Sequence, residues 1–85
     1  MRKFDLPAMG DGAKSFYGKA TVIELDNGDI ELESYNTIVC RIRNKKFEKL
    51  WDGYSTTTMR HINSFLELYR IDGGGKSWWN KLETV

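Results

Sequence analysis

The chain has 85 residues, with 13 Lys and Arg against 12 Asp and Glu, and a formal net charge of +1. A chain of this length forms one domain with a small core, burying about 60 to 65% of its unfolded surface. The balanced charge lacks the overall positive excess typical of nucleic-acid-binding proteins. One Cys and one His are too few for an internal disulfide or the usual four-ligand zinc site.

The sequence indicates neither a membrane span nor a targeting segment. No apolar run reaches the ~20 residues that a spanning helix needs, and the first residues, Met-Arg-Lys-Phe-Asp, lack the apolar region of a signal peptide. We therefore expect a cytoplasmic protein without a membrane partner, a metal or another cofactor. The oligomeric state stays open.

The beginning of the chain differs in pattern from the rest. Residues 1–13 contain the single proline, Pro7, and two glycines, without sustained apolar alternation. We predict a flexible N-terminal arm over 1–13 and a single domain over 14–85.

Period-two alternation then predicts a sheet. Asn27-Gly28 separates two alternating runs, which predicts a hairpin with a type I′ turn. The run from Tyr35 to Arg43 predicts a third strand, with Ile38, Cys40 and Ile42 inward and Val39, Arg41 and Arg43 outward. A fourth short strand is expected over Phe47 to Trp51. The predicted fold class is α+β, with a four-stranded antiparallel meander from about Phe16 to Trp51.

The apolar period changes to that of a helix after Tyr54. Ser55 is a favourable N-cap, and an apolar stripe follows at Met59, Ile62, Phe65, Leu66 and Tyr69. This pattern predicts one main helix from about Thr56 to Arg70, packed on one face of the sheet and ended by Asp-Gly-Gly-Gly. The remaining residues predict a short Trp-rich C-terminal tail with at least one Trp docked on the core.

Four segments carry a resemblance to a known family: KSFYGKA at 14–20, SYNT at 34–37, LWDGYSTTTMRHINSFL at 50–66 and GGKSWW at 74–79. They resemble a family of small uncharacterised proteins carried by phages and other mobile elements of Firmicutes, over residues 14–82. The family has no agreed activity or catalytic residues. Small proteins of such elements often inhibit or modulate host machinery, so the resemblance implies such a role, in its sharpest form an anti-CRISPR one.

Enzyme chemistry has weak candidates. His61 could form a relay with Thr57 or Thr58 and Asp52, but no oxyanion hole is evident, and a polar helix shoulder of Arg60 and His61 is favoured. Cys40 has inward parity and is expected to act as a small hydrophobe. Gly-Lys-Ser at 75–77 follows a helix instead of a strand, so it fails the context of a phosphate-binding loop. We predict no catalytic residue and no enzyme.

Charges and aromatic residues supply the binding candidates. Glu24, Asp26, Asp29, Glu31 and Glu33 are expected on the outer face of the first hairpin. There they could mimic phosphates or simply pair with Arg41 and Arg43 across the strands. The aromatic residues of the loop 51–54 and of the tail fill the core or, where they are exposed, favour protein recognition.

Two functions from different classes follow. The first is a non-enzymatic binding protein that inhibits or modulates a host protein, most sharply a CRISPR effector nuclease, through the partner-binding candidates Asp29, Glu31, Glu33, Trp51, Tyr54, Arg60 and Trp78. The alternative is a small nucleic-acid-binding module that uses the basic second hairpin, with the candidates Arg41, Arg43, Lys45, Lys46 and Lys49.

Overall fold

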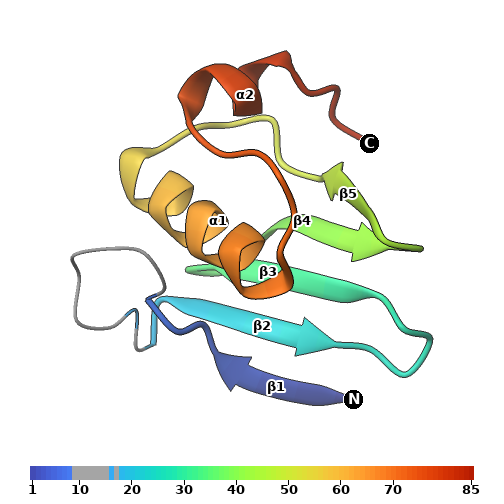
Figure 1. Cartoon of the computed structure of the whole chain (residues 1–85). Helices are drawn as coiled ribbons and strands as arrows, with labels where there is room; N and C mark the ends of the chain where they lie inside the picture. The colour runs from blue at the N-terminus through green and yellow to red at the C-terminus, as the bar shows by residue number, and fades with distance from the viewer. Residues whose placement is uncertain (9–15, 17) are drawn as a thin grey trace.

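The computed structural model describes residues 1–8, 16 and 18–85 (Figure 1). Five strands and two helices lie in this described part of the chain: β1 Arg2–Asp5, β2 Ala20–Glu24, β3 Ile30–Ser34, β4 Thr37–Arg43, β5 Lys46–Lys49, α1 Thr56–Tyr69 and α2 Lys76–Lys81. The predicted α+β class is therefore confirmed. Neither helix is long and apolar enough to cross a membrane.

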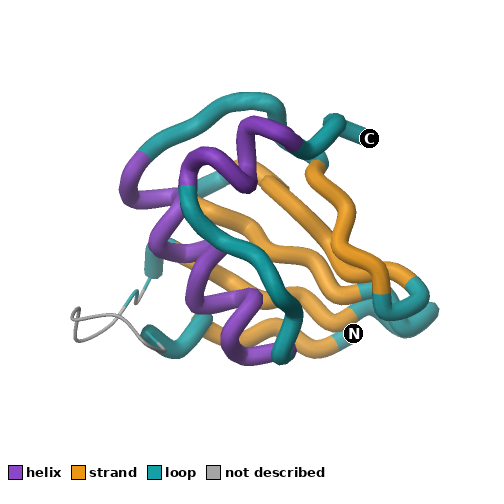
Figure 2. The backbone as a smooth tube through the Cα atoms, turned by 45° about the horizontal axis from the view of Figure 1, so that its top comes forward, coloured by secondary structure: helices purple, strands orange, loops and turns teal. Residues whose placement is uncertain are grey.

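The strands form one antiparallel meander in the order β1-β2-β3-β4-β5, with both helices on the same face (Figures 1 and 2). The expected sheet of four strands lacked β1, which pairs with β2 from Arg2 opposite Glu24 to Asp5 opposite Thr21. Part of the expected arm over 1–13 is thus a strand, while residues 9–13 lie outside the described residues. The four-residue strand has one inward apolar side chain, Phe4, too few to produce an alternation signal.

The first predicted hairpin has a different turn from the one expected. Leu25 and Asp29 close a three-residue loop through a 2.8 Å hydrogen bond from the Leu25 amide to the Asp29 carbonyl. Within this loop Gly28 has a positive φ of 94°, whereas a type I′ turn needs two such residues. The two-residue type I′ geometry occurs instead between β4 and β5, where Asn44 and Lys45 have φ values of 53° and 64°.

A bulge changes which side chains of β4 face the core. Leu32 pairs with Cys40 and Glu33 with Ile38, so Val39 is the additional residue. Val39 and Cys40 are consequently both buried. The prediction that Val39 points outward is wrong, because simple alternation does not hold across a bulge.

Helix α1 follows the predicted pattern closely. The Ser55 hydroxyl accepts a 3.0 Å hydrogen bond from the Thr58 amide and caps the helix. Met59, Ile62, Phe65 and Leu66 are buried against the sheet. The helix ends at Tyr69, and its C-cap residue Arg70 has a left-handed backbone.

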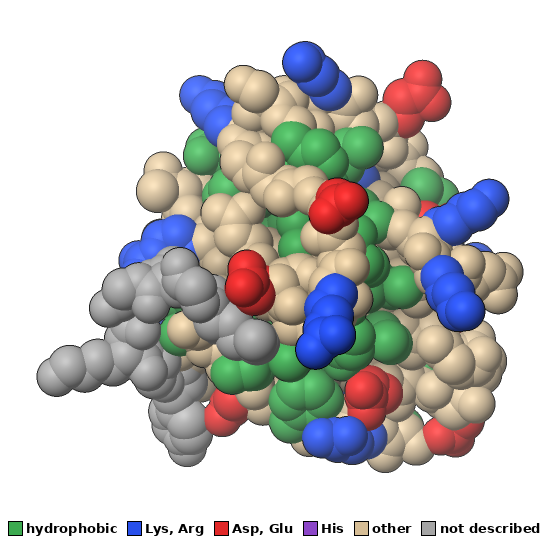
Figure 3. All heavy atoms as spheres, in the orientation of Figure 1, with side chains coloured by type: hydrophobic (Ala, Val, Ile, Leu, Met, Phe, Trp, Pro, Cys, Tyr) green, Lys and Arg blue, Asp and Glu red, His purple; other side chains and the backbone are tan. Residues whose placement is uncertain are grey.

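The C-terminal segment docks on the core through α2, as the sequence predicts for its tryptophans. Trp79 is fully buried, and its indole Nε1 donates a 2.8 Å hydrogen bond to the Gly53 carbonyl. The chain then returns to β5, where the Val85 amide donates to the Lys49 carbonyl at 2.7 Å. Figure 3 shows the face that carries the helices, with individual charged side chains between hydrophobic ones.

Candidate interaction surfaces

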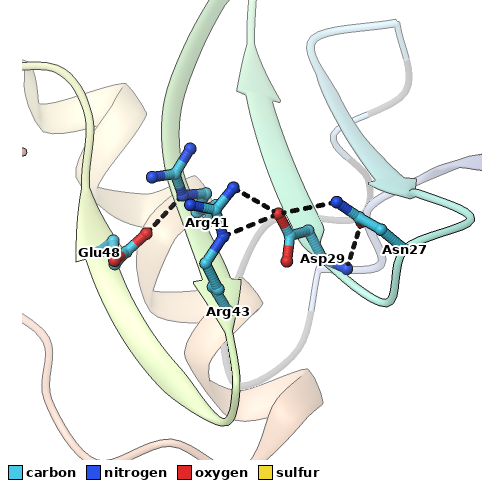
Figure 4. A network of polar contacts seen from close by, with 5 residues as sticks. All are labelled: Asn27, Asp29, Arg41, Arg43 and Glu48. Atoms are coloured by element: carbon cyan, nitrogen blue, oxygen red, sulfur yellow. Dashed lines mark hydrogen bonds and ion pairs between the residues drawn. The ribbon is translucent and has the colours of Figure 1, made fainter.

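The face of the sheet opposite the helices carries alternating charges. The strand register places Ile23, Glu31, Arg41 and Glu48 in one row across β2 to β5. Arg41 donates from Nε to Glu48 Oε1 (Figure 4). Glu31 lies opposite Arg41 in the register of β3 and β4. The predicted acidic and basic residues therefore interleave on this face, as the cross-strand pairing alternative required.

Asp29 also forms a cross-strand ion pair on this face, with Arg43, and it is not exposed. Its carboxylate oxygen Oδ2 accepts hydrogen bonds from Arg43 Nη2 at 2.7 Å and Arg43 Nε at 3.0 Å (Figure 4). Only 6% of Asp29 is exposed. The hydrogen bond from Arg43 is the main cause that lowers the pKa of Asp29. Asp29 was predicted to bind a partner, but Arg43 already occupies its carboxylate.

The five predicted acidic residues do not share one face. Glu24 faces the helices, where it accepts a hydrogen bond from the Tyr69 hydroxyl at 3.1 Å and from Arg2 at 3.2 Å. The pKa of Tyr69 is raised to about 12, first by burial of its hydroxyl and second by the hydrogen bond of that hydroxyl to Glu24. Asp26 pairs with the chain's amino group. The acidic residues of this hairpin therefore do not form a continuous row that could mimic phosphates. Glu31 and Glu33 are the acidic candidates that remain on the face of the sheet opposite the helices, which we call the open face.

The predicted basic cluster is also divided. Arg41 and Arg43 are held by Glu48 and Asp29. Lys49 is buried beneath α2, with Nζ 3.0 Å from the Trp79 carbonyl oxygen. Lys49 is thus not available to bind nucleic acid. The exposed members of the cluster are Arg43, which is paired with Asp29, and Lys45 and Lys46, at the β4–β5 turn.

His61 lies inside the domain and not on a polar shoulder of the helix. It has no exposed surface, and its ring contacts Phe16 edge-on with 4.6 Å between ring centres. Its Nδ1 is 2.8 Å from the Ser34 hydroxyl, which is itself 3.0 Å from the Thr58 hydroxyl. Arg60 is exposed, as expected, with its guanidinium 5.8 Å from the centre of the Phe16 ring.

The partner of His61 was not among the predicted site residues. Ser34 continues the inward parity of Leu32 on β3, and this parity is the signal that could have placed it against α1. The buried hydroxyl of Ser34 on β3, in contact with His61 and Thr58, therefore joins the sheet to α1. Asp52, the acid of the hypothetical relay, is exposed in the loop before α1.

The other two candidates for chemistry, Cys40 and the segment Gly-Lys-Ser at 75–77, both lie where they serve the fold. Cys40 is fully buried, and burial raises the pKa of its thiol far above the usual range. Gly75 is the N-cap residue of the six-residue helix α2, and Lys76 places Nζ 5.2 Å from the centre of the Tyr54 ring. Within the described ranges, no group of three or more His, Cys, Asp and Glu residues is arranged to hold a metal ion.

Three predicted partner-binding aromatics lie on α2 or on the loop fastened to it, and together with Lys76 they form what we call the α2 surface: Trp51, Tyr54, Trp78 and Lys76. The hydrogen bond from Trp79 to Gly53 fastens the loop that carries Trp51 and Tyr54 to α2. Trp78 is half-buried against Phe47, with 5.2 Å between ring centres. Tyr54 is 38% exposed. The structure therefore keeps aromatic area accessible around α2.

These features define a small α+β domain whose helices cover one face of an antiparallel meander. The chain belongs to a family of unknown function, DUF8033, whose model matches residues 4–81. This match agrees with the resemblance to a family of uncharacterised proteins. No curated protein and no solved structure matches the chain.

Proposed function

We propose that the protein is a non-enzymatic binding domain that recognises another protein through the α2 surface. The observation that carries this proposal is the accessible aromatic area of Tyr54 and Trp78 around α2, with the cation of Lys76 over the Tyr54 ring. Tyr and Trp dominate the energetics of protein interfaces because they bury a large, rigid area with little loss of conformational entropy.

The surroundings of the reactive side chains support a binding role. Cys40 is buried with a raised pKa, His61 joins α1 to β3, and Asp29 is paired with Arg43. A nucleophilic thiol would instead be accessible and have a lowered pKa. Each of these side chains thus contributes to the fold.

The finer form of the proposal concerns the partner. Following the resemblance to proteins of phages and mobile elements, we propose a host protein as the target, and a CRISPR effector nuclease as its sharpest form. Arg60, exposed on α1, could extend contacts with such a partner, whereas Glu31 and Glu33 lie on the opposite face of the sheet and stay separate binding candidates.

Pull-down from a host lysate tests the proposal. Tyr54→Ala is the test variant because its ring is exposed, and Tyr35→Asn is the control. Tyr35 is also exposed, lies in the β3–β4 turn and has a positive φ, which Asn tolerates. We expect the wild type and Tyr35→Asn to retain the same partner and Tyr54→Ala to lose it. Equal retention by all three would contradict the assignment to the α2 surface.

The anti-CRISPR form has its own readout. Added to purified RNA-guided nucleases, the wild type should reduce target cleavage, whereas folded Tyr54→Ala should not. Unchanged cleavage by the nucleases of the host that carries the protein would remove this form and leave the broader binding role to the pull-down.

The alternative, a nucleic-acid-binding module, rests on Lys45 and Lys46 at an exposed turn. Titration with single-stranded and duplex nucleic acid at low salt tests it, because phosphate contacts weaken steeply as salt rises. Salt-dependent binding that Lys45→Gln with Lys46→Gln abolishes would favour this alternative. Binding that is absent at low salt would exclude it.

A further inference from the structure

A hollow of about 350 Å³ lies between the end of α1, the strands β3 and β4 and the β4–β5 turn, on the helix side of the sheet. Ile30 and Ile42 are direct partners across these strands and face the helices. Together with Ile71 and the ring of Tyr69, they give the hollow an apolar wall. The complete lining is Ile30, Ile42, Lys45, Tyr69, Arg70 and Ile71.

The backbone brings two cations to this apolar wall. At the end of α1 the Ile71 amide donates to the Leu66 carbonyl at 2.9 Å, a helix-ending turn in which Arg70 has a φ of 56°. On the opposite side, Lys45 has a φ of 64° in the β4–β5 turn. Glycine or asparagine is favoured at such positions. Here both positions carry long basic side chains, which are exposed beside the hollow.

These two cations are not neutralised by the part of the protein that the structure describes. The ion pairs recorded there involve the amino group of Met1, Arg2, Arg41 and Arg43, and neither Lys45 nor Arg70. Of the nearby carboxylates, Glu24 is bound by Tyr69 and Arg2. Glu67 and Asp72 line a neighbouring hollow, which Arg70 also borders. The apolar hollow therefore presents a positive margin.

We propose that this hollow binds a small amphipathic carboxylate, a compact apolar body that carries one anionic group. The apolar body would lie against Ile30, Ile42 and Ile71, and the carboxylate would lie between Lys45 and Arg70. The volume is at the lower end of the roughly 300 to 1,000 Å³ of small-molecule sites, which are mostly apolar with a few polar groups that orient the ligand. Charge complementarity selects an anion over a neutral or cationic molecule of the same shape.

Titrations followed by NMR test the site with three probes of one shape and different charge: 3-phenylpropionate, 3-phenyl-1-propanol and 3-phenylpropylamine. With millimolar 3-phenylpropionate we expect the methyl signals of Ile30, Ile42 and Ile71 to shift together. The alcohol should bind more weakly, and the amine should bind weakest. No shift of these methyl groups with the carboxylate, or equal shifts with the amine, would overturn the proposal.

Charge variants locate the anion. Lys45→Gln and Arg70→Gln should each weaken binding of 3-phenylpropionate about two- to fivefold, the range of one exposed ion pair. Lys46→Gln is the matched control. Lys46 is exposed next to Lys45, but it lies opposite Arg43 in the strand register and therefore on the open face, away from the hollow. Equal weakening by Lys46→Gln would show a non-specific charge effect and overturn the site. Because Tyr54 and Trp78 do not line this hollow, this result is independent of the pull-down that tests the α2 surface.

Discussion

Lys49 places its ammonium nitrogen 3.0 Å from the carbonyl oxygen of Trp79 and 4.8 Å from the centre of the Trp79 ring. A second carbonyl, that of Leu82, is 3.3 Å from the same nitrogen. The ammonium therefore binds carbonyl groups at the C-terminal end of α2, where the helix dipole favours a cation. One lysine of the edge strand β5 thus attaches the C-terminal helix to the sheet.

Replacing Lys49 by Met tests this attachment. Lys49→Met keeps an apolar stem of similar length but leaves two carbonyls without their charged donor. We expect a loss of about 1 to 3 kcal/mol in the free energy of unfolding, measured by urea denaturation. Lys46→Met on the same strand is exposed and should change it by less than about 0.5 kcal/mol. Equal midpoints for the two variants would contradict a structural role for Lys49.

The sequence could predict the features that depend on neighbouring residues. The cap at Ser55 and the apolar stripe of α1 are correct, because capping and helical periodicity are local properties. The strand β1 was missed because Phe4 is its one apolar residue that faces the core, and the pairing partner lies 18 residues away at Val22. The strand exists because β2 offers it an edge.

The candidate site was less predictable for the same reason. Asp29 and Lys49 carry charges, so composition alone places both at the surface. Their burial depends on partners distant in sequence, Arg43 for the first and Trp79 for the second. Of the aromatic candidates, Trp51 and Trp78 are partly buried against the core and Tyr54 is exposed, so the sequence's two alternatives, core filling and surface exposure, both occur.

His61 provides the second prediction. The sequence favoured an exposed polar side of the helix formed by Arg60 and His61, but the His61 ring is buried and bonded to Ser34. We expect His61→Ala to cost about 2 to 4 kcal/mol through the cavity and the lost hydrogen bond. The neighbouring Arg60→Ala, at an exposed position, serves as the control in the same denaturation experiment. If His61→Ala left the free energy of unfolding unchanged, the result would contradict a stabilising hydrogen bond between His61 and Ser34.

Acid stability should depend on Asp29. Arg43 lowers the pKa of Asp29 from 3.8 in the folded protein, so its ionised form stabilises the fold. This contribution is complete above the unfolded pKa of 3.8 and is lost as the pH falls through the lower folded value. In thermal melts between neutral and acid pH, Asp29→Asn should therefore be less stable than the wild type at neutral pH, with the difference shrinking in acid. A difference that stays constant with pH would contradict the ion pair.

The Cys40 thiol should be unreactive while the protein is folded. It is buried, and its raised pKa keeps it protonated at neutral pH, whereas the thiolate is the reactive form. We expect no labelling by iodoacetamide in buffer and complete labelling in denaturing urea. Ser77→Cys, at an exposed position of α2, is the control and should be labelled at once in buffer. Labelling of Cys40 at a similar rate in buffer would show that the sheet opens readily.

The connection between α1 and α2 should tolerate no side chain at Gly73. Its φ is 142°, and an added Cβ would lie 2.5 Å from the Trp78 ring, whereas Gly28 also has a positive φ of 94° but faces open space. Both Gly73→Ala and Gly28→Ala carry a backbone strain of about 1 to 3 kcal/mol. Gly73→Ala must in addition displace Trp78 from Phe47. We therefore expect Gly73→Ala to destabilise the protein more than Gly28→Ala and to shift the tryptophan fluorescence of the folded protein, which Gly28→Ala should leave unchanged. Equal stability and identical spectra would mean that Trp78 does not rest on Gly73 in solution, and the aromatic region around α2 would then need a different arrangement.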